Sequence, residues 1–190
     1  DISLNDVHFG YEDGKEILHG VSFRVSVGDQ VTLAGRTGAG KSTIFRLILG
    51  LFAPWKGEVT VGGVSARDIP DETKRHIFGY VEQTFRPVPG TVLDQLTLGD
   101  PAVTKEMAIR AAKTVGLSET IESFPDGCDT PYRDEIFSQG ERQLLSVARA
   151  ISAEPPVLLL DEMTADLDAD TERMVLEAIR AASEGRTVLS

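Results

Sequence analysis

The chain has 190 residues, of which 41% are hydrophobic, which suits one domain with a substantial core. Its formal net charge of −11 argues against a nucleic-acid-binding protein, because such proteins usually carry a basic patch. The single cysteine, Cys128, excludes an internal disulfide framework and is interpreted as a loop residue without a role, and no apolar run is long enough to cross a membrane.

The chain begins with segments that favour β-strands. Ile2–Phe9 and residues 21–27 alternate apolar and polar side chains, and residues 12–15 (Glu-Asp-Gly-Lys) suit a turn between them. Residues 30–34 form a shorter apolar strand. These patterns predict an antiparallel pair followed by a strand that leads into a glycine-rich loop.

That loop, residues 35–43, fits the pattern G-x-x-x-x-G-K-[ST] and lies between the strand 30–34 and a predicted helix at 44–49. Its glycines allow the backbone amides and the positive end of the helix to approach phosphates. Lys41 adds charge near the β- and γ-phosphates, and Ser42 offers a hydroxyl to Mg²⁺. The expected phosphate-binding residues are Gly35, Thr37, Gly38, Ala39, Gly40, Lys41, Ser42 and Thr43.

The rest of the chain alternates strands and helices. The predicted strands are residues 58–61, 77–81, with His76 at its start, Val157–Leu160 and 186–190. The predicted helices are residues 104–115, capped by Thr104, and 118–124, 138–153 and 170–182.

This alternation predicts an α/β fold with a P-loop NTPase core, a mainly parallel sheet, an N-terminal antiparallel β-subdomain and an inserted α-helical subdomain. Residues 1–190 are expected to form one domain. Within it, residues 1–83 and 154–190 form the core with its β-subdomain, and about 84–153 form the helical part. Because the last strand begins where the chain stops, the C-terminal end is expected to be truncated.

Two acids follow the apolar strand Val157–Leu160. Asp161 and Glu162 should therefore lie at the carboxyl end of a buried strand, where ligands bind in such sheets. One carboxylate can hold Mg²⁺, directly or through water, and the next can polarise an attacking water. The upstream phosphate loop favours this interpretation over two solvated acids.

Residues 137–143 open the long helix. Ser138 and Glu141 fit a capping box, which is a sufficient structural reason for both. The box does not explain Gly140, which is costly in a first turn unless something approaches its backbone. Together they predict a second phosphate-binding surface.

In their order, these motifs resemble the nucleotide-binding domain of ABC transporters over essentially the whole chain. Residues 35–43 correspond to its Walker A motif, 137–141 (Phe-Ser-Gln-Gly-Glu) to its signature, commonly Leu-Ser-Gly-Gly-Gln, and 157–161 to Walker B. Glu162 stands at the catalytic glutamate position, Gln83 at the Q-loop glutamine, and residues 164–168 at the D-loop. Tyr11 stands where the family places an aromatic that stacks on adenine, with ordinary packing as the alternative.

The segments 88–92 and 132–135 make the exporter half-transporter the most similar subtype. The signature departs from the family at Gln139, which replaces a glycine, and at Glu141, which replaces a glutamine. The family's switch histidine is expected beyond Ser190.

The resemblance implies ATP hydrolysis with Mg²⁺ in a head-to-tail dimer that binds two ATP molecules. Lys41 and the loop amides would hold phosphates, Ser42, Gln83 and Asp161 would hold Mg²⁺, and Glu162 would position water. Ser138 and Gly140 would touch the γ-phosphate bound to the other subunit, and Asp168 would lie near the subunit boundary. Glu162, Lys41 and Gln83 are the expected catalytic residues.

The expected function is the ATP-hydrolysing motor of an exporter. It would contact a transmembrane domain and a second nucleotide-binding domain at the cytoplasmic face of the cell membrane, and no nucleic acid. Two alternatives stay open: a soluble ABC-type ATPase, and a degenerate ATP-binding half-site of a heterodimeric exporter. Glu162 argues against the half-site, whereas Gln139 and Glu141 keep it open.

Overall fold

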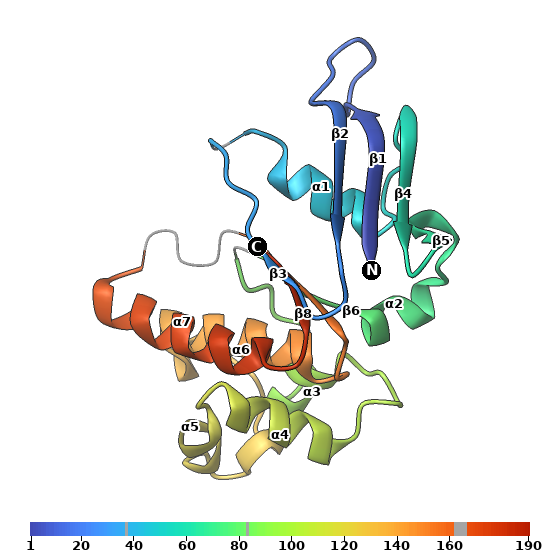
Figure 1. The fold of residues 1–190 in the computed structure, drawn as a ribbon. Helices are drawn as coiled ribbons and strands as arrows, with labels where there is room; N and C mark the ends of the chain where they lie inside the picture. The colour runs from blue at the N-terminus through green and yellow to red at the C-terminus, as the bar shows by residue number, and fades with distance from the viewer. Residues whose placement is uncertain (37, 83, 162–166) are drawn as a thin grey trace.

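A computed structural model describes residues 1–36, 38–82, 84–161 and 167–190. It contains two four-stranded sheets and a group of helices (Figure 1). The antiparallel sheet has the order β2-β1-β4-β5 and the parallel sheet the order β3-β8-β7-β6. The strands are β1 (Ile2–Phe9), β2 (Leu18–Val25), β3 (Gln30–Val31), β4 (Lys56–Val61), β5 (Val64–Ser65), β6 (Phe78–Val81), β7 (Val157–Leu160) and β8 (Thr187–Leu189).

Strand β7 of the parallel sheet is buried on both faces. Alternate residues of a strand point to opposite faces, so Leu158 and Leu160 join one apolar cluster while Val157 and Leu159 join another. The first cluster is shared with α6 (Gln139–Ile151) and α7 (Ala169–Ser183), and the second with α1 (Lys41–Ile48) and the antiparallel sheet. This confirms the doubly covered strand predicted at 157–160.

Two predicted strands begin or end elsewhere. The strand predicted at 21–27 runs from Leu18 to Val25 and is followed by a turn, in which Ser26 N donates to Asp29 Oδ2 at 2.8 Å and Val27 is exposed. The strand predicted at 30–34 is regular only at Gln30–Val31. Leu33 N still donates to Ser190 O, so the β3 edge continues to contact the end of β8.

The strand predicted at 77–81 is wrong at its start. Residue 77 ends α2 (Asp71–Ile77), so His76 lies in a helix and β6 begins at Phe78. Acids in the first turn of α2 and bases in its last turn complement the helix dipole. Because α2 is short and none of its residues is fully buried, it lacks the apolar stripe that identifies a helix in sequence.

The helices of the middle segment gather at the end of the molecule away from the antiparallel sheet (Figure 1). They are α3 (Val92–Thr97), α4 (Lys105–Thr114) and α5 (Ser118–Glu122). Thr104 caps α4 as predicted, because its Oγ1 accepts from Met107 N at 3.2 Å. In the described parts of the chain, none of the helices combines the length and apolar character that a membrane crossing needs.

The interpretation of Cys128 as a loop residue without a role is wrong. It lies in a 3₁₀ turn, Gly127–Asp129, and is 8% exposed in the apolar cluster formed by the helices. Its side chain therefore contributes packing to this part of the core.

Candidate functional site

The glycine-rich loop joins β3 to α1. Gly38 and Gly40 have φ values of +83° and +92°, which a glycine adopts at little cost. A Cβ on Gly40 would also lie 2.7 Å from Leu18 Cδ2, so both conformation and space restrict this position. The loop is exposed around Gly35, Gly38 and Ala39, whereas Thr37 lies outside the described residues.

Helix α1 begins at Lys41, directly after Gly40. No side chain caps its N-terminus and its first turn has no acidic residue. The first amides of a helix have no intrahelical acceptor, so this end of α1 suits an anion. Lys41 Nζ donates to Gly35 O at 3.1 Å, which folds its ammonium over the loop.

Ser42 and Asp161 come together at this end of the sheet. Ser42 Oγ donates a hydrogen bond of 2.9 Å to Asp161 Oδ1, although the residues are 119 positions apart. Asp161 N donates to Val81 O at 3.0 Å, which continues the pairing of β7 with β6. Asp161 is 9% exposed, so its carboxylate is fixed where the glycine-rich loop and β7 meet.

Tyr80 is a member of this site that the sequence interpretation missed. Its hydroxyl donates to Asp161 Oδ2 at 3.1 Å, so each carboxylate oxygen accepts one hydrogen bond. Burial and the neighbouring Asp161 raise the pKa of Tyr80, so its hydroxyl stays protonated at neutral pH. Only the parallel register of β6 and β7 brings this side chain next to Asp161.

Tyr11 lies beside α1. Its hydroxyl is 3.1 Å from Thr43 Oγ1 and accepts from Arg46 Nη1 at 2.9 Å. Its ring packs edge-on against Phe9 and Phe52, with centroid distances of 5.1 and 5.3 Å, and remains 43% exposed. The structure thus brings Tyr11 to the same helix as the loop and leaves ring surface open for stacking.

The start of α6 carries the capping box predicted from Ser138 and Glu141. Glu141 N donates to Ser138 Oγ at 3.2 Å, and Ser138 N donates to Glu141 Oε2 at 2.8 Å. Glu141 Oε1 accepts from Thr120 Oγ1 at 2.8 Å, so both carboxylate oxygens fold back onto the protein. Burial opposes ionisation of this carboxyl, but these hydrogen bonds outweigh it and lower the pKa of Glu141.

The structure explains why position 140 is a glycine, which the sequence did not reveal. A Cβ at this position would lie 2.7 Å from Thr171 Cγ2 and 2.8 Å from Met174 Cε, so α7 closes against this turn. Within the described chain, Ser138 and Gly140 form no hydrogen bond to the loop 35–43. Their neighbours belong to α6 and α7.

Asp168 begins α7. Its Oδ1 accepts from Asp170 N and Thr171 N, each at 3.1 Å, and its Oδ2 accepts from Thr171 Oγ1 at 2.6 Å. The hydrogen bonds from Thr171 lower the pKa of Asp168, so it is a charged helix cap. Gln83 and Glu162, the two other expected catalytic residues beside Lys41, lie outside the described residues.

The segment that follows Gln83 is tied to the helices by two residues that the sequence interpretation missed. Gln95 is fully buried and bonds both Val88 N and Val88 O, at 2.8 and 2.7 Å. Arg149 donates to Arg86 O at 2.7 Å and to Gln95 O at 2.6 Å, and its guanidinium lies 4.3 Å from the Phe85 ring centre. Burial lowers the pKa of Arg149 to about 10, which leaves it cationic at neutral pH.

The donor set beside the loop suits a hard cation. Ser42 and Asp161 supply a hydroxyl and a carboxylate, the oxygen ligands that Mg²⁺ prefers. Among the described residues no group of three or more His, Cys, Asp or Glu could hold a metal alone.

Comparisons with known proteins give one consistent result. Residues 18–165 match the family described as ABC transporter. The chain is 35% identical over 188 residues to a probable multidrug resistance ABC transporter ATP-binding/permease protein of Bacillus subtilis, covering 98% of this chain and 28% of that protein. It is 36% identical over 188 residues to the human mitochondrial iron-sulfur clusters transporter, covering 98% and 25%.

A solved structure of a bacterial Atm1-family ABC exporter with ATP bound superimposes with a TM-score of 0.85 at 34% identity. The match covers 100% of this chain and 33% of that one. This chain therefore spans between a quarter and a third of the length of these relatives.

Proposed function

Because this chain belongs to the ABC transporter family, as the ATP-binding domain of an exporter-type member, we propose that its ATP hydrolysis drives export through membrane helices outside it. The family and the α/β fold expected from the motifs are thereby confirmed, as is an ABC ATPase domain. On this proposal, the binding site for the exported substrate would lie in those membrane helices.

The contact between Ser42 and Asp161 carries the proposal. This hydrogen bond of 2.9 Å joins the glycine-rich loop to the acidic end of a buried strand. P-loop ATPases need these two elements side by side, because together they bind the nucleotide and its metal ion. When bound, Mg²⁺ neutralises developing charge on the β- and γ-phosphates. Ser42, Gln83 and Asp161 would hold it, and Tyr80 would keep the Asp161 carboxylate oriented.

The remaining roles follow from the chemistry of phosphoryl transfer, which depends on positioning and charge stabilisation. Lys41 would exchange its bond to Gly35 O for the phosphates. Tyr11 would stack on adenine with its exposed ring surface. Glu162 would position the attacking water.

A second copy or a homologous domain would complete the site. Ser138 Oγ accepts from Glu141 N, and its own O–H can still donate to a phosphate. Ser138 and Gly140 contact residues of α6 and α7 rather than the loop of their own chain, which favours a head-to-tail dimer in which each signature faces the partner's ATP. Because Glu141 is folded back, its charge does not argue for a degenerate half-site.

We further propose that residues 84–153 are a helical subdomain between core segments 1–83 and 154–190, and that the helical part contacts the transmembrane domain at the cytoplasmic face. The ties of Gln95 and Arg149 to residues 85–88 support this proposal. They give a physical connection from the loop after Gln83 to α3 and α6.

The test is the Glu162→Gln variant. We expect it to bind ATP, to lose turnover, and to form an ATP-dependent dimer in sedimentation velocity, whereas Glu162→Gln combined with Lys41→Ala should stay monomeric. Wild-type turnover in the single variant would remove Glu162 from this role. An absence of turnover in the wild-type chain with retained ATP binding would favour the degenerate half-site.

A further inference from the structure

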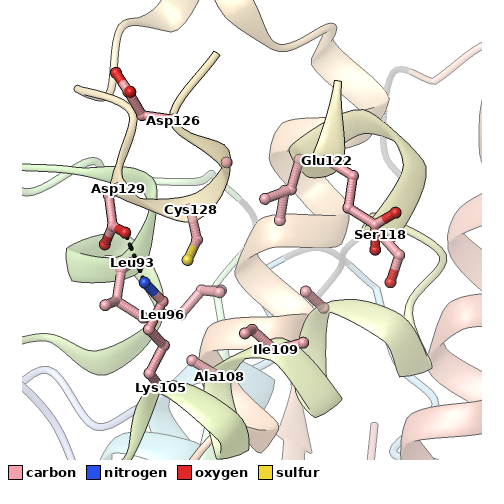
Figure 2. Close-up of a pocket in the computed structure, with 13 residues that line it drawn as sticks. Leu93, Leu96, Lys105, Ala108, Ile109, Ser118, Glu122, Asp126, Cys128 and Asp129 are labelled. Carbon is pink, nitrogen blue, oxygen red and sulfur yellow. Dashed lines mark hydrogen bonds and ion pairs between the residues drawn. The ribbon is translucent and has the colours of Figure 1, made fainter. Parts of the chain in front are cut away.

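A hollow of about 280 Å³ lies in the helical part, between α3, α4, α5 and the turn Gly127–Asp129 (Figure 2). None of its lining residues belongs to the nucleotide site. Its floor is apolar, because Leu96, Ala108 and Cys128 are each no more than 8% exposed. Figure 2 shows the Cys128 sulfur pointing into this space toward Leu96.

The mouth of the hollow is charged. Lys105 Nζ pairs with Asp129 Oδ2 at 2.6 Å on one side, drawn as the dashed line in Figure 2. Glu122 and Asp126 also line the hollow, and neither has an ion-pair partner in the part of the chain that the structure describes. The lining therefore holds three carboxylates against one ammonium, and two of the carboxylates are not compensated.

The apolar floor and the acidic mouth together restrict the chemistry of a molecule that could bind in this hollow. An apolar floor favours an apolar group over water. Carboxylates at the rim of a low-dielectric cleft attract cations and repel anions. The volume lies near the lower end of ligand pockets, roughly 300–1,000 Å³, so the occupant is small.

We propose that this hollow binds a small organic cation whose apolar group contacts Leu96 and Cys128 while its ammonium lies at the mouth, on the side of Glu122 or on that of Asp126. Figure 2 shows these two acids on different sides of the space, Glu122 on α5 and Asp126 before the turn that carries Cys128. An anionic ligand of the same shape gains the apolar contact but is repelled at the mouth.

The experiment uses three probes of similar shape, benzylammonium, benzyl alcohol and benzoate, added to the ¹⁵N-labelled 190-residue chain without nucleotide. We expect benzylammonium to shift the amide signals of Ile109, Glu122 and Cys128 and to bind at least about fivefold more tightly than benzyl alcohol at low salt, with benzoate weakest. Cys128 is the only cysteine, so its alkylation by iodoacetamide gives a second readout, which benzylammonium should slow.

The matched variants change only exposed acids. Glu122→Gln with Asp126→Asn should reduce benzylammonium binding to the level of benzyl alcohol. Glu119→Gln, on the same helix but outside the lining, should leave the preference unchanged. Equal binding of the alcohol, a preference that survives in the double variant, or amide shifts elsewhere would each overturn the proposal.

Discussion

Ser42, in the first turn of α1, donates a hydrogen bond to Asp161 at the end of β7 across 2.9 Å, and Tyr80 on β6 donates to the other oxygen of the same carboxylate. Asp161 is thus held from two sides, by the phosphate loop and by the neighbouring strand. A change in the position of the loop would alter the hydrogen bond to this carboxylate, so substitutions around Asp161 test the proposed nucleotide site.

The first prediction concerns Lys41. Lys41→Ala removes the ammonium that lies over the loop, so Mg-ATP affinity should fall at least about tenfold, or ~1.4 kcal/mol. Calorimetric titration measures this affinity, and Lys113→Ala, an exposed lysine on α4, is the control. Unchanged affinity in Lys41→Ala would contradict the assignment of the phosphate loop.

Tyr80→Phe removes one hydroxyl and keeps the ring that packs edge-on against Phe45. With one oxygen of Asp161 unbonded, we expect the Mg²⁺ concentration needed for half-maximal tightening of ATP binding to rise several-fold, as hydrogen bonds to charged groups contribute about 1.5–3 kcal/mol. ATP binding without Mg²⁺ should not change. A fluorescent ATP analogue titrated at several Mg²⁺ concentrations measures both quantities.

Tyr132→Phe is the matched control for this variant, because the Tyr132 hydroxyl also bonds a carboxylate, Asp134 at 2.8 Å, but in the segment before α6. An equal change in both tyrosine variants would show that Tyr80 acts only through general stability.

Gln95→Leu should destabilise the fold. The fully buried amide bonds Val88 N, Val88 O and Thr91 O, and leucine would leave these backbone groups without a partner at a cost of about 1–3 kcal/mol or more. Urea unfolding measures the loss. The same substitution at exposed Gln139 should stay within about 0.5 kcal/mol; an equal effect at both positions would contradict a role for the buried amide.

The capping box at α6 predicts a pH dependence. Because the folded-state pKa of Glu141 is lowered from 4.5, its contribution to stability is complete above that value and is lost as the pH falls through the lowered pKa. We expect the unfolding free energies of Glu141→Gln and the wild type to differ near about pH 6, and the difference to shrink as the pH falls below 4.5 and through the lowered pKa. Urea unfolding over a series of decreasing pH values checks this, and a difference independent of pH would point away from the carboxylate.

Gly140→Ala separates packing from ligand contact. Its Cβ would meet Thr171 and Met174, so overpacking of about 1–3 kcal/mol is expected, partly offset by roughly 1 kcal/mol of helix propensity. Adding Thr171→Ser and Met174→Ala, which remove Thr171 Cγ2 and Met174 Cε, should relieve the clash in unfolding experiments. If ATP turnover stays low when stability has returned, Gly140 also serves the ligand; full recovery of turnover would restrict it to packing.

Much of the fold could be predicted because its signals are local. The strand Val157–Leu160 was evident as a continuous apolar run. The cap at Thr104 was evident because a periodic apolar segment follows it, and the cap at Ser138 from Glu141 three positions later. The helices α2 and α3 were missed, since both are short and neither carries a long periodic apolar stripe.

The sequence by itself determined the glycine-rich loop, the acidic strand end and the family, because these depend on residue types at fixed short spacings. Only the tertiary structure decided that Tyr80 supports Asp161, that α7 closes over Gly140, and that Gln95 and Arg149 hold the segment after Gln83. These contacts join residues on different elements, and they depend on which strands are neighbours and which helix faces meet. No local pattern specifies that choice, because it results from burying all the apolar faces of the chain at once.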